Sequence, residues 1–218
     1  MTVSARRGER ARTKRATVIP LPTTARGQRT RQKLIDSAEA VFGERGFHNA
    51  GIVEITQRAD VALGTFYIYF PDKRSIFEDL VHTLNSRLRR TIAAQVRDID
   101  DRLEQEVVGF ETFFEFVRKH RNLYRVILQA ETVDDDLYRW HYRTLAEGYV
   151  QGLRKAQAAG QVRSDLDAET LAYSLMGMAE SLGSRYVLWD GRRPPAATRR
   201  TIRAFLENGL RGKPRRKS

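Results

Sequence analysis

Apolar residues recur at helical spacing along most of the chain, from about residue 29 to about residue 210. In residues 29–45 the apolar side chains stand at i, i+1, i+4, i+7 and i+8 and form one continuous face, made of Leu34, Ile35, Ala38, Val41 and Phe42. Gly46 follows, as expected of the residue that ends a helix. No stretch of useful length alternates apolar and polar residues as a strand does. The pattern predicts an all-α protein.

Eight more helices are predicted after the first, which gives nine in all. They cover about residues 52–59, 63–69, a long helix from Asp72 through Ile92, 101–119, 122–131, 135–159, 168–189 and 196–210. Asp72 and Asp167 stand where an N-cap is expected. The acidic run Asp134-Asp135-Asp136 also stands at a predicted helix start, where it would complement the helix dipole. A metal site is the alternative interpretation of that run.

Residues 46–73 carry the most specific pattern in the chain. Two short helical patterns flank the turn Asp60-Val61-Ala62, which is the layout of a helix-turn-helix whose second helix enters a DNA major groove. In the second helix Phe66 and Phe70 stand one turn apart and are expected to face inward, so Tyr67 and Tyr69 project outward. The alternative is that these aromatic residues simply pack a small helical core.

The run Gly64-Thr65-Phe66-Tyr67-Ile68-Tyr69-Phe70-Pro71-Asp72-Lys73 strongly resembles the recognition helix and following turn of TetR-family transcriptional regulators. Chain length and helical pattern are similar to that family from about residue 28 to about residue 210. The resemblance implies that Gly64, Thr65 and Tyr67 contact bases and that Tyr69 and Lys73 contact phosphates. Leu63 and Ile68 fall on the same surface, where they could read only methyl groups or shape.

Some positions depart from the family pattern. The family often has Ser or Thr where this chain has Ala50, Gly51 and Ala62, and usually glycine where it has Asp60. Those hydroxyls would cap the two short helices and hold phosphates, and alanine cannot do so through its side chain. At the start of the helix that begins near residue 52, His48 or the backbone amide of Gly51 is expected to make the phosphate contact instead.

The net charge of +12 is concentrated in the two tails. Residues 1–33 hold ten basic residues against one acid, and residues 211–218 add five more basic residues, which leaves the middle close to neutral. Tails of this density bind polyanions without reading sequence. Residues 1–26 lack apolar periodicity and are expected to be a disordered basic arm. A solvated tail with no specific role is the alternative.

Nine of the twenty aromatic residues fall within residues 110–149. In the TetR family this region surrounds an effector pocket, so the resemblance implies a cavity for a small hydrophobic or amphipathic ligand. The expected lining is Phe110, Phe113, Phe114, Val117, Tyr124, Leu128, His141, Tyr142 and Leu145. The alternative is an ordinary aromatic core.

Catalysis has little support in the sequence. The four histidines are scattered, and no metal-binding, nucleophile-elbow, P-loop or dinucleotide motif occurs. We therefore expect that the protein is not an enzyme and that it has no catalytic residue, no metal and no cofactor. The chain has no cysteine, no apolar run long enough to span a membrane and no signal-peptide core, so no membrane partner and a cytoplasmic location are expected.

The last two predicted helices carry paired apolar stripes. One stripe is Leu171, Leu175, Met178 and Leu182, and the other is Ile202, Phe205, Leu206 and Leu210. Two such helices at a chain end suggest a four-helix homodimer interface, which the last two helices of TetR-like proteins form. Burial of both stripes within one subunit is the alternative.

These observations predict a ligand-responsive, sequence-specific DNA-binding regulator, in particular a repressor that a small hydrophobic effector releases from a palindromic double-stranded operator. The expected organisation is a basic arm (1–26), a three-helix helix-turn-helix domain (27–73), a helical bundle for ligand binding and dimerisation (74–210) and a basic tail (211–218). Two alternatives remain: a non-specific DNA-binding protein driven by its tails, and a small helical enzyme that uses the aromatic pocket.

Overall fold

A computed structural model describes residues 19–211, and within that range the protein is all-α. It has nine α-helices and one π-helical turn: α1 (Ala25–Arg45), α2 (Ile52–Arg58), α3 (Leu63–Tyr69), α4 (Lys73–Val96), α5 (Arg102–Lys119), α6 (Arg121–Val133), α7 (Asp135–Ala158), α8 (Ala168–Gly183), η1 (Ser184–Trp189) and α9 (Ala196–Leu210). In this range the only β pairing is an isolated bridge between Val162 and Arg211. The fold class predicted from the sequence is confirmed.

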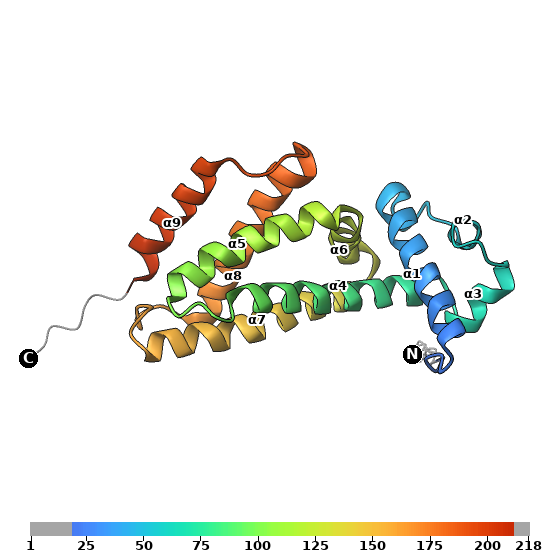
Figure 1. Cartoon of the computed structure of the whole chain (residues 1–218), viewed down its shortest axis with the longest axis horizontal. Coiled ribbons are helices and arrows are strands. Elements are labelled where there is room, and N and C mark those ends of the chain that lie inside the picture. Colours follow the sequence, from blue (N-terminus) through green and yellow to red (C-terminus); the bar gives the residue numbers. More distant parts are fainter. Residues whose placement is uncertain (1–18, 212–218) are drawn as a thin grey trace, which may run out of the picture.

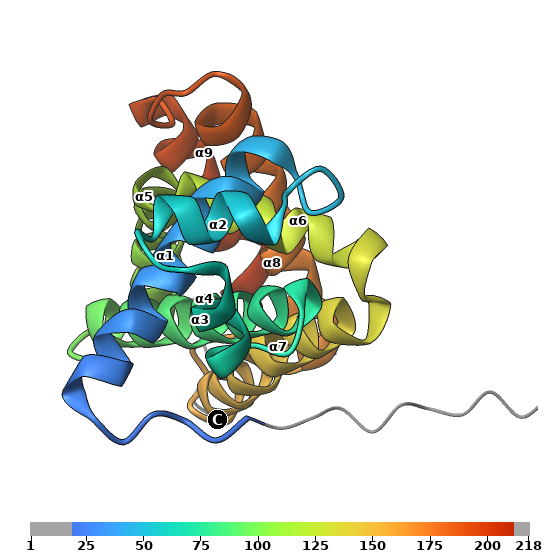
Figure 2. The ribbon, with the colours of Figure 1, turned by 90° about the vertical axis from the view of Figure 1, so that its right-hand side faces the viewer.

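The molecule is elongated, and α4 runs along it (Figure 1). Helices α1, α2 and α3 gather at one end, onto which Figure 2 looks. At the other end α4 packs against α5 and α7, and α8 packs against the same two helices, so these four helices form a bundle. Helix α6 crosses between the two parts and contacts α1, α4 and α7.

Side-chain caps set the helix starts. Asp72 accepts from the Ser75 amide at 2.8 Å, and the Ser75 hydroxyl closes a capping box at the start of α4. Asp134 and Asp167 cap α7 and α8 by accepting from the backbone amides of Leu137 and Thr170. Asp60 lies in the left-handed region (φ 54°) between α2 and α3, which Asp adopts more readily than most residues.

Two differences from the predicted helices have a clear local cause or form. Helix α1 begins at Ala25 rather than near residue 29, because the Thr24 hydroxyl accepts from the Gly27 amide at 3.1 Å. The helix expected over 168–189 ends as an α-helix at Gly183 and continues as the π-helical turn η1. Residues 1–18 of the proposed arm and 212–218 of the proposed tail lie outside the described residues.

The larger of two apolar clusters in the described part of the chain joins the two parts of the molecule. It includes Phe42 of α1 and Phe77 of α4, whose ring centroids lie 5.5 Å apart at nearly a right angle. Because the same cluster continues through α5, α6 and α9, the three-helix end does not have a core of its own.

Candidate DNA interface and ligand cavity

Helix α3 has a buried face and an exposed face, as its sequence predicts. Phe66 and Phe70 are buried, with ring centroids 5.7 Å apart. Leu63, Tyr67 and Ile68 are 45%, 50% and 63% exposed. Because phenylalanine fills the inward positions, these three side chains remain on the surface. Aliphatic side chains and a tyrosine there can contact thymine methyl groups and base edges.

The other residues assigned to this surface differ in their exposure. Gly64 is exposed, and no atom would obstruct a side chain there. Thr65 is half-buried. Tyr69, predicted to project outward like Tyr67, is instead half-buried and packs against the core, so less of it is available than of Tyr67. Their contacts with DNA stay predictions.

The loop before α2 exposes His48 and Gly51 on the same end of the molecule. Gly51 is the N-cap of α2 and has extended geometry, with no side chain to cap the helix. The His48 ring packs edge-on against Phe47, 5.5 Å between centroids. Both are accessible for a phosphate contact.

The Lys73 side chain is hydrogen-bonded within the chain. Its Nζ donates to the carbonyl oxygens of Phe47 (2.7 Å), Ala50 (2.8 Å) and, more weakly, His48 (3.4 Å). It also lies 4.6 Å from the centre of the Phe47 ring. Its N–H donors are therefore engaged inside the chain, and partial burial lowers the pKa of Lys73. In this structure Lys73 ties the loop before α2 to the start of α4, and its contact with a DNA phosphate stays a prediction.

The bundle encloses a cavity of about 430 Å³ between α4, α5, α7 and α8, with α6 at its side. Of the nine residues expected to line it, six do: Phe110, Phe113, Tyr124, His141, Tyr142 and Leu145. Phe114, Val117 and Leu128 do not. Phe114 and Val117 are buried in the core outside the cavity, and Leu128 lies on the outer side of α6, 37% exposed.

One polar group in the cavity wall joins α5 to α7. Arg102 and Glu106 form an ion pair at 2.5 Å, and the Tyr149 hydroxyl donates to the other oxygen of Glu106. Burial raises the pKa of Glu106, while the positive charge of Arg102 opposes that change. The three side chains bond mainly to one another, so they form a structural link between α5 and α7 in the cavity wall.

A second polar group lies where α7 and α8 meet. The Tyr142 hydroxyl donates to Glu180 Oε1 at 2.6 Å. Burial and the neighbouring carboxylate raise the pKa of Tyr142, and the same two causes raise the pKa of Tyr124 on α6. Both tyrosines stay protonated and can donate hydrogen bonds at neutral pH.

Helix α6 connects the cavity to α1. Tyr124 and Ile127 line the cavity, while residues on other sides of α6 contact the end of α1. Gln129 accepts from the Phe47 amide at 2.6 Å and donates to the Phe42 carbonyl at 3.3 Å. A Cβ at Gly43 would lie 2.4 Å from the Asn122 Cβ, so only glycine allows this close approach.

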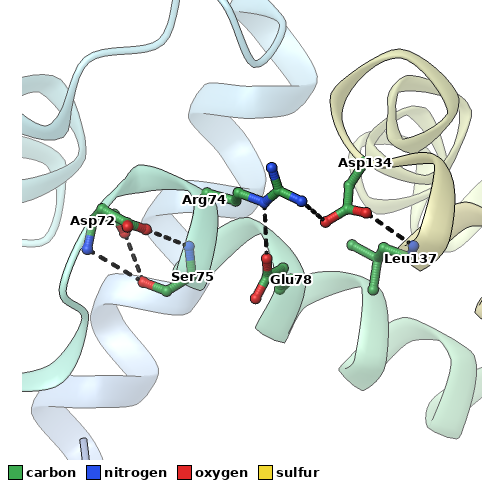
Figure 3. Close-up of polar contacts among 6 residues, drawn as sticks. All are labelled: Asp72, Arg74, Ser75, Glu78, Asp134 and Leu137. Atoms are coloured by element: carbon green, nitrogen blue, oxygen red, sulfur yellow. Dashed lines mark hydrogen bonds and ion pairs between the residues drawn. The ribbon is translucent and has the colours of Figure 1, made fainter. Parts of the chain in front are cut away.

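A further contact joins the start of α4 to the start of α7 (Figure 3). Arg74 donates to Glu78 one turn away at 3.0 Å and forms an ion pair with Asp134. Asp134 at the same time accepts from the Leu137 amide at 3.0 Å, which makes it the N-cap of α7. The capping role predicted for the acidic run is confirmed at Asp134.

The two C-terminal helices bury only part of their apolar stripes. Leu206 is fully buried and Ile202 is nearly so, whereas Phe205 is 64% exposed. Tyr173 on α8 and Trp189 after it are exposed as well. Leu206 therefore belongs to the core of the subunit, and Phe205 is the residue of this stripe available to a second copy.

The charged cavity residues were missed by sequence analysis. Arg102, Glu106 and Glu180 are polar residues that a helical pattern places on the surface. The available signal was that Glu106 directly precedes Val107 on the apolar face of α5, one turn after Arg102. In residues 19–211 no three His, Asp or Glu side chains gather closely enough to hold a metal ion, and no helix combines the length and apolarity needed to cross a bilayer.

Comparison with known proteins agrees with this architecture. Residues 34–80 match the sequence model of bacterial regulatory proteins of the tetR family. Over 192 residues the chain is 28% identical to the uncharacterised HTH-type transcriptional regulator YdgC of Bacillus subtilis, covering 85% of this chain and 95% of that protein.

Solved structures share the fold at lower identity. The fatty acid degradation regulator FadR from Bacillus halodurans superposes with a TM-score of 0.74 at 22% identity, over 84% of this chain and 97% of that one. FadR from Bacillus subtilis in complex with stearoyl-CoA gives a TM-score of 0.72 at 19% identity, over 82% and 98%. At such identities the likeness establishes the fold.

Proposed function

The chain belongs to the TetR family of helix-turn-helix transcriptional regulators, and from this premise we propose that it is a repressor released from its operator by a small hydrophobic effector. One observation carries the proposal: α6 lines the bundle cavity with Tyr124 and Ile127 and also packs against α1. A ligand that moves α6 therefore acts on the DNA-binding end directly.

The DNA-binding part of the proposal rests on α3. We assign sequence reading to Thr65, Tyr67 and the exposed aliphatic residues Leu63 and Ile68, with Gly64 allowing close approach. His48 and the Gly51 amide hold the phosphate backbone beside it. Two copies related by a two-fold axis would place two α3 helices in successive major grooves, which requires a palindromic operator.

The effector part rests on the cavity. Its wall is mostly apolar and aromatic, so the ligand has an apolar body. The relative solved with stearoyl-CoA has the same fold, which makes an acyl chain one candidate for that body. Steroid-like molecules and apolar drugs are the others.

Coupling follows from two sets of contacts. Gln129 and Asn122 of α6 hold the end of α1, and Lys73 and Arg74 hold the start of α4. Expansion of the cavity would displace both sets, tilt the three-helix end and change the spacing of the two recognition helices. DNA and effector would then weaken each other's binding by the same factor.

A binding-site selection followed by titration tests the DNA-binding part. Duplexes enriched from a random pool are compared with scrambled duplexes by fluorescence anisotropy between 50 and 200 mM KCl, a range over which non-specific contacts weaken strongly. We expect the selected duplex to keep its advantage as salt rises. A protein that binds DNA only through its basic tails would lose affinity for both duplexes together.

Thermal-shift screening of hydrophobic compounds tests the effector part. Compounds that raise the melting temperature are then added to the protein–operator complex. The proposal requires that at least one of them releases the DNA, and that operator DNA weakens the binding of that compound. Stabilising compounds that leave DNA affinity unchanged would contradict it.

A further inference from the structure

One end of the cavity holds a carboxylate surrounded by aromatic rings. Glu180 of α8 lines the cavity beside Phe113 of α5, Tyr124 of α6 and Tyr142 of α7. The ring of Phe113 lies edge-on to Tyr124, with 5.7 Å between centroids. The Tyr142 hydroxyl donates to Oε1 of Glu180 at 2.6 Å. Four helices therefore contribute to one acidic, aromatic end.

No cation of the described chain balances this carboxylate. In residues 19–211 Glu180 forms no ion pair, and its side chain is hydrogen-bonded by Tyr142. Two arginines line the cavity elsewhere. Arg102 is paired with Glu106. Arg89 lies on α4, across the bundle from α8, and donates to the Asn85 side chain at 2.9 Å.

The surroundings of Glu180 favour a positive charge. Glu180 is half-buried in the cavity wall, where a nearby cation would stabilise its negative charge, and the electron-rich faces of tyrosine and phenylalanine attract the same kind of group. A ligand carboxylate placed here would be repelled by Glu180. The apolar side chains of the same cavity, among them Leu88 and Ile92 on either side of Arg89 on α4 and Leu145 on α7, suit an alkyl or aryl body.

We infer that the effector is an amphipathic cation: an ammonium group held by Glu180 among Tyr124 and Tyr142, and an apolar body extending toward α4. This inference rests on the proposed function, because it names the chemistry of the ligand for that cavity. Glu180 then selects for charge, while the rest of the cavity selects for size and shape.

Three probes of equal chain length test the inference on the full chain: decylammonium, 1-decanol and decanoate, each below its micelle-forming concentration. Isothermal titration gives their affinities. We expect decylammonium to bind about tenfold more tightly than decanol, since one charge-assisted contact is worth roughly that factor, and decanoate to bind most weakly.

Glu180→Gln keeps the size of the side chain and an acceptor for Tyr142 while removing the charge. It should weaken the binding of decylammonium by about tenfold and change the affinity for decanol by less than about twofold. Glu147→Gln, on the exposed side of α7, removes the same charge outside the cavity and should change neither. Circular dichroism melting of each variant establishes that the fold is retained.

Equal or tighter binding of decanol or decanoate by the native chain would overturn the inference, as would an unchanged decylammonium affinity in Glu180→Gln. Absence of binding by all three probes would overturn it too. If decanol or decanoate bound best and released operator DNA, the proposed function would stand and only the cationic chemistry would fall. If decylammonium bound as expected but left DNA affinity unchanged, the site would stand and the proposed function would fall.

Discussion

The side chain of Asn85 on α4 reaches across to His141 on α7 and contacts it twice. Its Nδ2 lies 3.2 Å from His141 Nδ1 and donates to the His141 carbonyl oxygen at 3.0 Å. Both residues are buried, and the Asn85 Oδ1 accepts from Arg89. The amide donors of Asn85 require an unprotonated Nδ1, so this contact holds His141 in its neutral form.

This contact predicts a loss of stability in mild acid. Burial lowers the pKa of His141 from 6.5 to about 4. Between these two values the unfolded chain binds a proton that the folded chain does not, so the free energy of unfolding decreases as pH falls from about 6.5 toward 4. Lowering the pH from 7 to 5 should cost about 2 kcal/mol from this group.

Urea unfolding of the native chain and of His141→Gln at several pH values measures that contribution. Glutamine cannot take up a proton, so the variant should show a shallower dependence on pH in this window, although its stability at pH 7 is expected to be lower. Parallel curves for the two proteins would rule out His141 as the responsible group.

Tyr67 and Thr65 are predicted to read the operator. Tyr67→Ala or Thr65→Ala should weaken binding to a selected duplex by about 1–3 kcal/mol and leave binding to random DNA nearly unchanged. Anisotropy titrations on both duplexes measure the difference. Tyr67→Phe separates the ring from the hydroxyl. Equal losses on both duplexes would mean that these side chains do not read sequence.

Lys73 is predicted to position the loop before α2 rather than bind phosphate. Lys73→Met removes its hydrogen bonds to the carbonyls of Phe47 and Ala50 and should lower the free energy of unfolding by about 1–2 kcal/mol. Operator affinity should fall as well, because Gly51 and His48 lose their support. The slope of log K against log salt should stay the same.

The salt slope is the deciding measurement for Lys73. If the native lysine neutralised a phosphate, its replacement would reduce the slope by about one unit. Lys155→Met, on the exposed side of α7, is a matched control that should affect neither stability nor DNA binding. A reduced slope for Lys73→Met alone would show that Lys73 leaves the carbonyls and reaches the backbone of DNA.

Phe205 is predicted to lie in the dimer interface. Phe205→Arg should yield a folded monomer by light scattering, because the native side chain is 64% exposed within the subunit. Leu206→Arg should instead unfold or aggregate the chain, since it places an unpaired charge at a fully buried position. If the Phe205→Arg protein remained dimeric, the interface would have to lie on another surface.

The N-terminal arm is predicted to add affinity for DNA without adding stability. The truncation should end at residue 18, because Thr24 caps α1 and must be kept. Residues 1–18 carry six basic residues and one acid. Their removal should leave the melting temperature unchanged and flatten the salt dependence by up to ~0.9 for each phosphate that the arm neutralises. Unchanged affinity together with an unchanged slope would exclude a role for the arm.

Local signals in the sequence were sufficient for most helix boundaries. Aspartate before an apolar pattern marked the starts of α4, α7 and α8, because its side chain caps the free amides of the first turn. Thr24 is also a capping residue, but the residues after it are mostly polar, so the early start of α1 had no apolar pattern to support it. The change to η1 was hidden because apolar residues continue through it.

The cavity was less predictable because its lining depends on how neighbouring helices are rotated. Phe110 and Phe113 face the cavity and Phe114 faces away, although all three lie on the apolar side of α5. Sequence periodicity gives the apolar side of a helix but not which part of it meets a given neighbour. The same limit applies to Lys73, whose partners come from a loop 23 to 26 residues away.

The double use of α6 constrains how this regulator can diversify. Tyr124 and Ile127 line the proposed effector cavity, and Asn122 and Gln129 on the same short helix contact α1. Substitutions in α6 that adapt the cavity to a new compound would therefore also shift the affinity for DNA in the absence of any compound. Lineages that acquire new ligands, and engineers who build biosensors from this scaffold, have more freedom at the cavity positions of α5, α7 and α8.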